Sequence, residues 1–83
     1  MSTHPIEIEA EIRERLDALA ANSDPAAFQA LLGLSRYLGE CLGLSARAMA
    51  EASSWGDVAG VAGTTKQAAW SRWHHYPPRR PSG

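Results

Sequence analysis

The sequence has few of the residues that build disulfides, strands or membrane spans. Its 83 residues include one cysteine, Cys41, which excludes an internal disulfide and a thiolate metal cluster. There is no apolar run of about 18 residues for a membrane-spanning helix, and the acidic start lacks the pattern of a signal peptide. Valine and isoleucine together number five, and no segment alternates apolar and polar residues. We therefore expect a cytoplasmic protein without strands.

Motifs for catalysis and for cofactors are also missing. The sequence has neither a glycine-rich phosphate loop nor histidines and cysteines at metal-ligand spacing. His74 and His75 are adjacent and would face different sides of a helix, so they make a poor metal pair. Cys41 lies in an apolar segment with no histidine nearby, which is typical of a small buried side chain. The sequence thus predicts no enzyme, no cofactor and no metal site.

The composition instead favours helices. Alanine accounts for fifteen residues, while leucine, isoleucine and valine together number only thirteen. Alanine and leucine lose little side-chain freedom in a helix, so the expected fold class is all-α. A single small domain with so few large apolar groups has a marginal core, and we expect it to associate with itself.

Charge is distributed unevenly along the chain. Residues 1–43 contain seven acids and three arginines, a net charge of −4, whereas residues 44–83 have a net charge of +3. The second half could bind a polyanion, and a solvated basic face would explain its charge equally well.

Two helices are expected in residues 1–53, which we interpret as a dimerisation module. Pro5 suits a first helical turn, and the spacing of apolar residues predicts a helix over 5–21. Asp24 is a good N-cap for a second helix over 25–53. Because glycines are costly inside a helix, a break at Gly43 is the alternative.

Apolar side chains recur along both helices and predict a helical hairpin. They could pack inside one monomer, or pair with a second copy to form a four-helix bundle. We favour the homodimer, because one hairpin leaves little protected core. The residues expected at its interface are Phe28, Leu31, Leu38, Leu42 and Met49, with the stripe of Ile8, Ile12 and Leu16.

Residues 54–75 have the signals of two short helices joined by a tight turn. Ser54 can cap the first helix and Thr65 the second, while Gly63 suits a left-handed turn between them. Ala59, four residues before this glycine, and Ala69, six residues after it, have small side chains that would let the two helices cross closely. This pattern predicts a helix-turn-helix.

The same segment resembles the DNA-binding helix-turn-helix of small actinobacterial regulators. The resemblance lies in about 20 residues, which read Ser54-Trp55-Gly56-Asp57-Val58-Ala59 and then Gly63-Thr64-Thr65-Lys66-Gln67-Ala68-Ala69-Trp70-Ser71-Arg72-Trp73. Gly56 and Gly60 depart from the pattern and weaken the first helix, and Thr64 replaces a more usual apolar residue. The resemblance implies a nucleoid-associated protein that binds double-stranded DNA and regulates transcription.

The second short helix would then enter the major groove of DNA. Gln67 can bond to adenine, and Lys66 to guanine or a phosphate. We expect Trp55 and Trp73 in the core and Trp70 mainly over the core edge, with a thymine methyl or a sugar as the alternative contact of Trp70. The expected DNA-binding residues are Thr65, Lys66, Gln67, Trp70, Ser71 and Arg72 on this helix, and Arg79 and Arg80 beyond it.

Residues 76–83 are rich in proline and arginine and are expected to form a flexible tail. Arg79 and Arg80 could follow a phosphate backbone, or could simply be solvated. A second function remains open, that of an adaptor bound to another protein, either an accessory factor of the transcription machinery or an antitoxin. The acidic pair of N-terminal helices favours this alternative.

Overall fold

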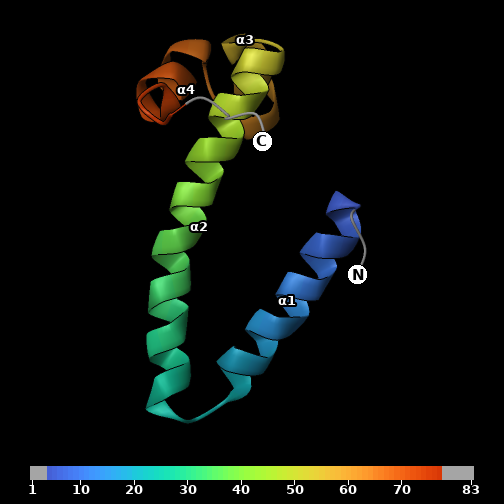
Figure 1. Ribbon diagram of the computed structural model, residues 1–83, viewed down its shortest axis with the longest axis vertical. Helices are drawn as coiled ribbons and strands as arrows, with labels where there is room; N and C mark the ends of the chain where they lie inside the picture. Colours follow the sequence, from blue (N-terminus) through green and yellow to red (C-terminus); the bar gives the residue numbers. More distant parts are fainter. Residues whose placement is uncertain (1–3, 78–83) are drawn as a thin grey trace, which may run out of the picture. The chain divides into compact units, whose positions relative to one another are not determined.

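The computed structural model describes residues 4–77, which form four α-helices and no strand. The helices are α1 (Pro5–Ala21), α2 (Pro25–Ala52), α3 (Trp55–Ala62) and α4 (Lys66–Trp73) (Figure 1). The all-α prediction is confirmed. None of the helices in this part of the chain is long and apolar enough to cross a membrane.

α1 begins and ends where the sequence predicts. His4 is its N-cap, because the Nδ1 atom of His4 accepts a hydrogen bond from the Ile6 N–H at 3.2 Å. Sequence reasoning assigned His4 no role. Glu9 and Arg13 form an exposed ion pair one turn apart, with 2.8 Å between nitrogen and oxygen. Such a pair adds a few tenths of a kcal/mol to a helix, so α1 is supported locally rather than by burial.

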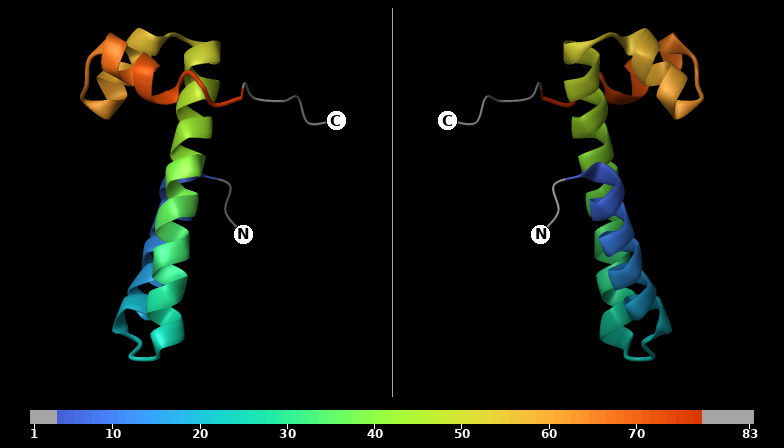
Figure 2. Two further views of the ribbon diagram at one scale, coloured as in Figure 1. Left: turned by 90° about the vertical axis from the view of Figure 1, so that its left-hand side faces the viewer. Right: turned by 90° about the vertical axis from the view of Figure 1, so that its right-hand side faces the viewer.

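α2 is one continuous helix of 28 residues (Figure 2). Asp24 caps it as predicted, since its carboxylate accepts a hydrogen bond from the Ala26 N–H at 2.8 Å. The alternative with a break at Gly43 is wrong. A Cβ at Gly43 would overlap the ring of Tyr76, which therefore lies directly on the helix backbone there. The missing side chain at Gly43 makes room for this ring, so the glycine serves packing rather than a turn.

The chain divides into two compact units between Tyr37 and Leu38, and α2 runs through the boundary. The second unit contains a core in which the end of α2 meets α3 and α4. Its buried side chains are Ala46, Val58, Ala59, Ala69 and Trp73, and the partly buried residues packed against them are Met49, Ala50, Trp55 and Tyr76.

This core changes the expected place of two residues. Trp73 and Trp55 lie in or against it, as predicted. Met49, expected at the dimer interface, instead packs here because the last turns of α2 face the two short helices. Tyr76, expected in the flexible tail, also packs here, because Gly43 leaves space for its ring. Residues 78–83 lie outside the described part of the chain.

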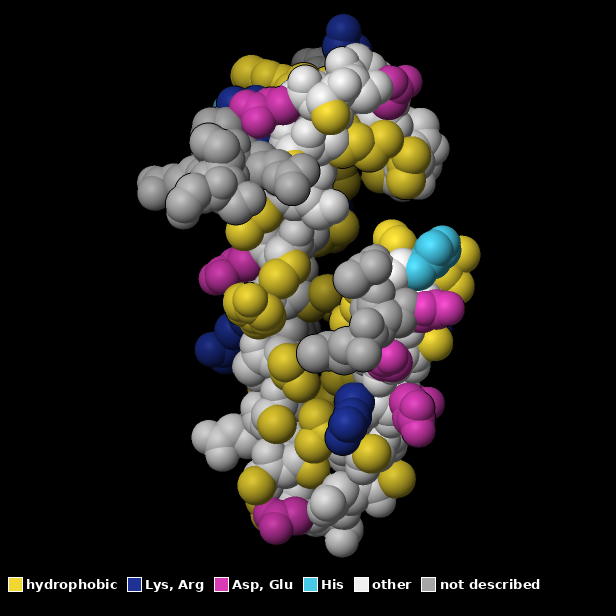
Figure 3. Space-filling view, turned by 45° about the vertical axis from the view of Figure 1, so that its right-hand side comes forward, with side chains coloured by type: hydrophobic (Ala, Val, Ile, Leu, Met, Phe, Trp, Pro, Cys, Tyr) yellow, Lys and Arg dark blue, Asp and Glu magenta, His cyan; other side chains and the backbone are white. Residues whose placement is uncertain are grey.

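The first unit buries little. Among its described residues Ala27 alone is buried, and Leu16, Leu19 and Leu31 are partly buried. Hydrophobic side chains lie at the surface of α1 and α2 (Figure 3). The large exposed ones on these two helices are Ile6, Ile8, Ile12, Phe28, Leu32, Leu34, Tyr37, Leu38, Leu42 and Leu44. Cys41, on the part of α2 that belongs to the second unit, is partly buried, whereas the sequence predicts it to be buried.

Candidate functional site

The candidate site is built on α3, α4 and the turn between them. α3 begins where the sequence predicts, because the Ser54 hydroxyl oxygen accepts a hydrogen bond from the Asp57 N–H at 3.0 Å. The preceding Ser53 donates its hydroxyl proton to the Asp57 carboxylate. An acid in the first turn also complements the positive end of the helix dipole. The start of α3 is thus fixed by side chains within four residues of one another.

The end of α3 reverses the chain in three residues. Gly63 adopts the predicted left-handed backbone, with φ 70° and ψ 35°. The Ala59 carbonyl accepts hydrogen bonds from the Gly63 N–H and from the Thr64 N–H, the latter at 3.0 Å. The Thr65 hydroxyl oxygen then accepts from the Ala68 N–H at 3.1 Å and caps α4. These hydrogen bonds cap the end of α3 and the start of α4 through neighbouring residues.

The two short helices pack through the small side chains that the sequence singled out. Ala69 is 0% exposed and Ala59 is 4% exposed, and both belong to the core of this unit. Alanines at these positions allow two helices to approach closely, and a larger side chain would separate them. α3 forms despite Gly56 and Gly60, and nothing lies within 4 Å of a Cβ built at Gly60. The packing of α3 on α4 thus does not depend on this glycine.

The residues predicted to bind DNA on α4 are all exposed. Thr65 is the N-cap, and Lys66, Gln67, Trp70, Ser71 and Arg72 follow on the helix. Gln67, Trp70 and position 74 are spaced by three and four residues, so they share one side of the helix. Arg79 and Arg80 lie outside the described residues. The exposed side of α4 therefore offers amide, hydroxyl, cationic and aromatic groups together.

Trp70 lies at the surface and contacts His74, a contact that the sequence did not predict. Its side chain is 48% exposed, and its ring stacks on His74, with ring centroids 3.8 Å apart and the planes 6° from parallel. The Nδ1 atom of His74 lies 2.6 Å from the Trp70 carbonyl oxygen. Sequence reasoning considered His74 only as a metal ligand. The signal it missed is the spacing of four residues, which brings two rings together on a helix.

The charged residues of α4 all carry positive charge. The helix contains Lys66 and Arg72 and no acid. Arg72 is exposed, and its guanidinium carbon lies 5.2 Å from the centroid of the Trp73 ring, within the range of a cation–π contact. Lys66 stands in the first turn, where a cation opposes the helix dipole. The position of Lys66 is thus unfavourable for the isolated helix and would become favourable beside an anion.

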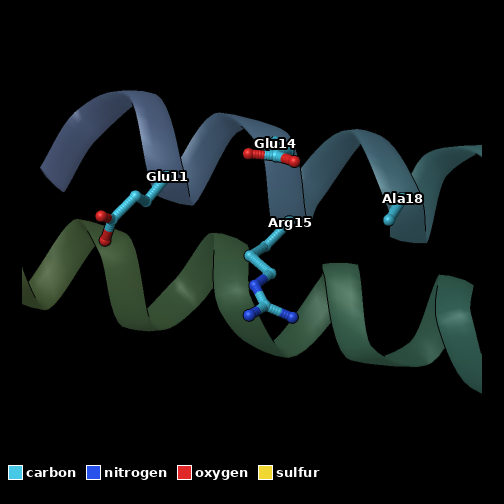
Figure 4. Close-up of a pocket in the computed structure, with 4 residues that line it drawn as sticks. All are labelled: Glu11, Glu14, Arg15 and Ala18. Carbon is cyan, nitrogen blue, oxygen red and sulfur yellow. The ribbon is translucent and has the colours of Figure 1, made fainter. Parts of the chain in front are cut away.

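A second polar feature lies on α1. A shallow depression is lined by Glu11, Glu14, Arg15 and Ala18, all on this one helix (Figure 4). The side chains of Glu11 and Arg15 extend to the same side of the helix, as a spacing of four residues requires. Over residues 4–77 no three His, Cys, Asp or Glu side chains are grouped as a metal site would need.

Searches against protein families, curated proteins and solved structures find no match to this chain.

Proposed function

We propose that α3, the turn at Gly63 and α4 form a helix-turn-helix that binds double-stranded DNA, and that the protein regulates transcription as a homodimer. The observation that supports this most is that one side of α4 is packed and the other side is exposed. The helix is held from behind by the end of α2 and by α3 through a packed core, while its opposite side exposes polar and cationic groups. A recognition helix needs both properties, a rigid support and a free side for the groove.

The side chains on α4 suit particular DNA contacts. Gln67 can bond bidentately to the N6 and N7 atoms of adenine, and Lys66 can donate to guanine or to a phosphate. Thr65 and Ser71 can donate hydroxyl protons to phosphates, and Arg72 is free of any acidic partner on its own helix. A phosphate beside Lys66 would also offset the unfavourable place of this cation at the helix start.

The partner proposed for α1 and the exposed side of α2 is a second copy of the chain. The described residues 4–37 bury one side chain, which is too little for two helices to be stable alone. Phe28, Leu38 and Leu42 are large and exposed along the predicted interface of α2. A parallel symmetry-related copy would cover the same residues on both chains. The two helix-turn-helix motifs of such a dimer would contact DNA half-sites about 34 Å apart.

The proposal is tested by titrating the purified protein against duplex DNA at two salt concentrations. If Lys66 and Arg72 of both protomers neutralise four phosphates, affinity should fall on the order of 100-fold between about 50 and about 200 mM salt. Replacing Lys66, Gln67 and Arg72 together by alanine should abolish most of this binding. The control is charge reversal on α1 at Glu7, Glu11 and Glu14, which should leave DNA binding intact.

The opposite pattern would favour the adaptor. In that case DNA binding is absent even at low salt, the triple variant of α4 keeps full function, and charge reversal on α1 abolishes it. The observation that favours this second function is the acidic surface of α1, where Glu11 and Glu14 border the depression. The two functions therefore depend on different helices, and one set of variants separates them.

A further inference from the structure

One feature of α4 goes beyond the expected contacts, the pairing of Trp70 with His74. The two rings lie nearly parallel, 3.8 Å between centroids, which is direct contact of their faces. His74 is the residue that follows the last turn of α4, and its N–H bonds back to the Trp70 carbonyl. One residue thus closes the end of the helix and covers one face of the indole.

The bond made by the imidazole fixes its orientation. A carbonyl oxygen is only an acceptor, so the Nδ1 atom of His74, 2.6 Å from the Trp70 oxygen, must be the donor. The ring is then held both by this hydrogen bond and by the stack. Because the stack is mutual, the held imidazole favours one orientation of the Trp70 indole.

Neither ring of this stack belongs to the buried core of the second unit. A tryptophan can bury 150–250 Å² of surface, yet Trp70 is left 48% exposed while Trp73 on the same helix fills the core. Trp70 also lies on the side of α4 that includes Gln67. An ordered aromatic ring is therefore kept at the surface beside a residue proposed to contact bases.

We propose that His74 is a positioning residue that holds the Trp70 indole against the methyl group of a thymine in the major groove. This inference rests on the proposed DNA-binding function. Thymine is the one base of DNA whose major-groove edge presents a methyl group, and apolar side chains recognise it by contact. The indole supplies the apolar surface, and His74 lowers the entropy lost when that surface docks.

His75 is the other aromatic neighbour of His74. Its ring lies edge-on to that of His74, with 5.9 Å between ring centroids. A test of the stack must therefore include a variant of His75 as a control.

The stack itself is tested without DNA. The imidazole covers one face of the Trp70 indole, so His74→Ala should raise the quenching of tryptophan fluorescence by acrylamide. This rise should be absent in a chain that already has Trp70→Phe, and neither His74→Phe, which keeps a flat ring, nor His75→Ala should cause it. If His74→Ala leaves the quenching unchanged, the stack is absent in solution and the proposal is overturned.

The reading of thymine is tested on a DNA site selected from random duplexes with the unaltered protein. Replacing each thymine in turn by deoxyuridine removes one methyl, and one such change should weaken binding about fourfold, as expected for one buried methylene-sized group. Trp70→Ala should bind both DNAs equally. His74→Ala should lose affinity by about twofold to tenfold, together with this discrimination.

His74→Phe serves as the rescue variant, because it keeps a flat ring over Trp70 without the imidazole. It should restore the discrimination between thymine and deoxyuridine that His74→Ala lacks, which a general loss of folding could not explain. Equal discrimination in His74→Ala and the unaltered protein would overturn the proposal. Failure of the unaltered protein to bind any duplex would instead refute the proposed function, while the fluorescence experiment still reports on the stack.

Discussion

At the scale of single residues, the contact between Gly43 and Tyr76 explains why α2 tolerates a glycine in its middle. Glycine costs a helix about 1 kcal/mol relative to alanine. At Gly43 this cost is offset by the ring of Tyr76, which lies where a Cβ would stand. Gly39, one turn earlier in the same helix, has nothing within 4 Å of a Cβ built on it. The two glycines therefore differ in their packing although the sequence presents them alike.

We predict that alanine has opposite effects at these two positions. Gly39→Ala should raise the free energy of unfolding by about 1 kcal/mol, because it improves helix propensity without a clash. Gly43→Ala should lower it by about 1–3 kcal/mol, because the added methyl overlaps the Tyr76 ring. Urea denaturation at one fixed protein concentration measures both.

A double variant checks the cause. Once Tyr76→Ala has removed the ring, adding Gly43→Ala should stabilise the chain as Gly39→Ala does. Equal stabilisation by both single alanines would show that the ring does not lie on Gly43.

At the scale of elements, the boundaries of the helices could be predicted well from sequence. Asp24, Ser54 and Thr65 are N-caps in the structure as expected, because capping depends on residues two or three positions away. The same local logic found Gly63, whose left-handed backbone ends α3. Short-range hydrogen bonds therefore account for the parts of the candidate site that sequence reasoning predicted correctly.

Some contacts of these helices were not predicted, because a pattern of apolar residues does not rank the alternatives. Trp70 and Trp73 are both tryptophans on one short helix, and their three-residue spacing allows either to face the core. Trp73 is buried in the core, whereas Trp70 stacks on His74 at the surface. Likewise Met49 fits the heptad spacing of a dimer interface but lies close enough to α3 and α4 to pack there. The choice depends on how three helices meet, which periodicity along one helix does not specify.

The turn between α3 and α4 provides the prediction at this scale. Gly63→Ala should lower the free energy of unfolding by about 1–2 kcal/mol, because a Cβ is strained at positive φ even where space is open. Gly63→Asn should cost less, since asparagine tolerates this conformation. Gly60→Ala, inside α3 with nothing near its Cβ, is the matched control and should be neutral or stabilising. Thermal unfolding followed by circular dichroism distinguishes them, and equal effects at both glycines would contradict the turn.

At the scale of the whole molecule, the division of burial is the feature with the largest consequence. The core formed by the end of α2, α3 and α4 includes a buried tryptophan, while the described part of the first unit buries only Ala27. Composition predicted this shortage, because alanines outnumber the large aliphatic residues. Sequence could not say which unit would lack a core, since that depends on where the tryptophans pack. The exposed apolar residues of α2 are thus the surface most in need of a partner.

The proposed dimer predicts that a charge on this surface separates the copies. Leu38 is 65% exposed and lies on the predicted interface, so Leu38→Glu should weaken the dimer at least about 100-fold, because one leucine per protomer stops being buried. Leu44→Glu is the matched control, since Leu44 is 45% exposed on the same helix but off the predicted interface rows. Sedimentation should give the mass of two chains for the unaltered protein and for Leu44→Glu, and of one chain for Leu38→Glu.

The affinity for DNA should fall in the variant that loses the dimer, because a single helix-turn-helix lacks the gain from a second, linked helix-turn-helix. A Leu38→Glu protein that keeps the dimer mass would place the interface elsewhere, and a monomeric unaltered protein would leave DNA binding to a single α4.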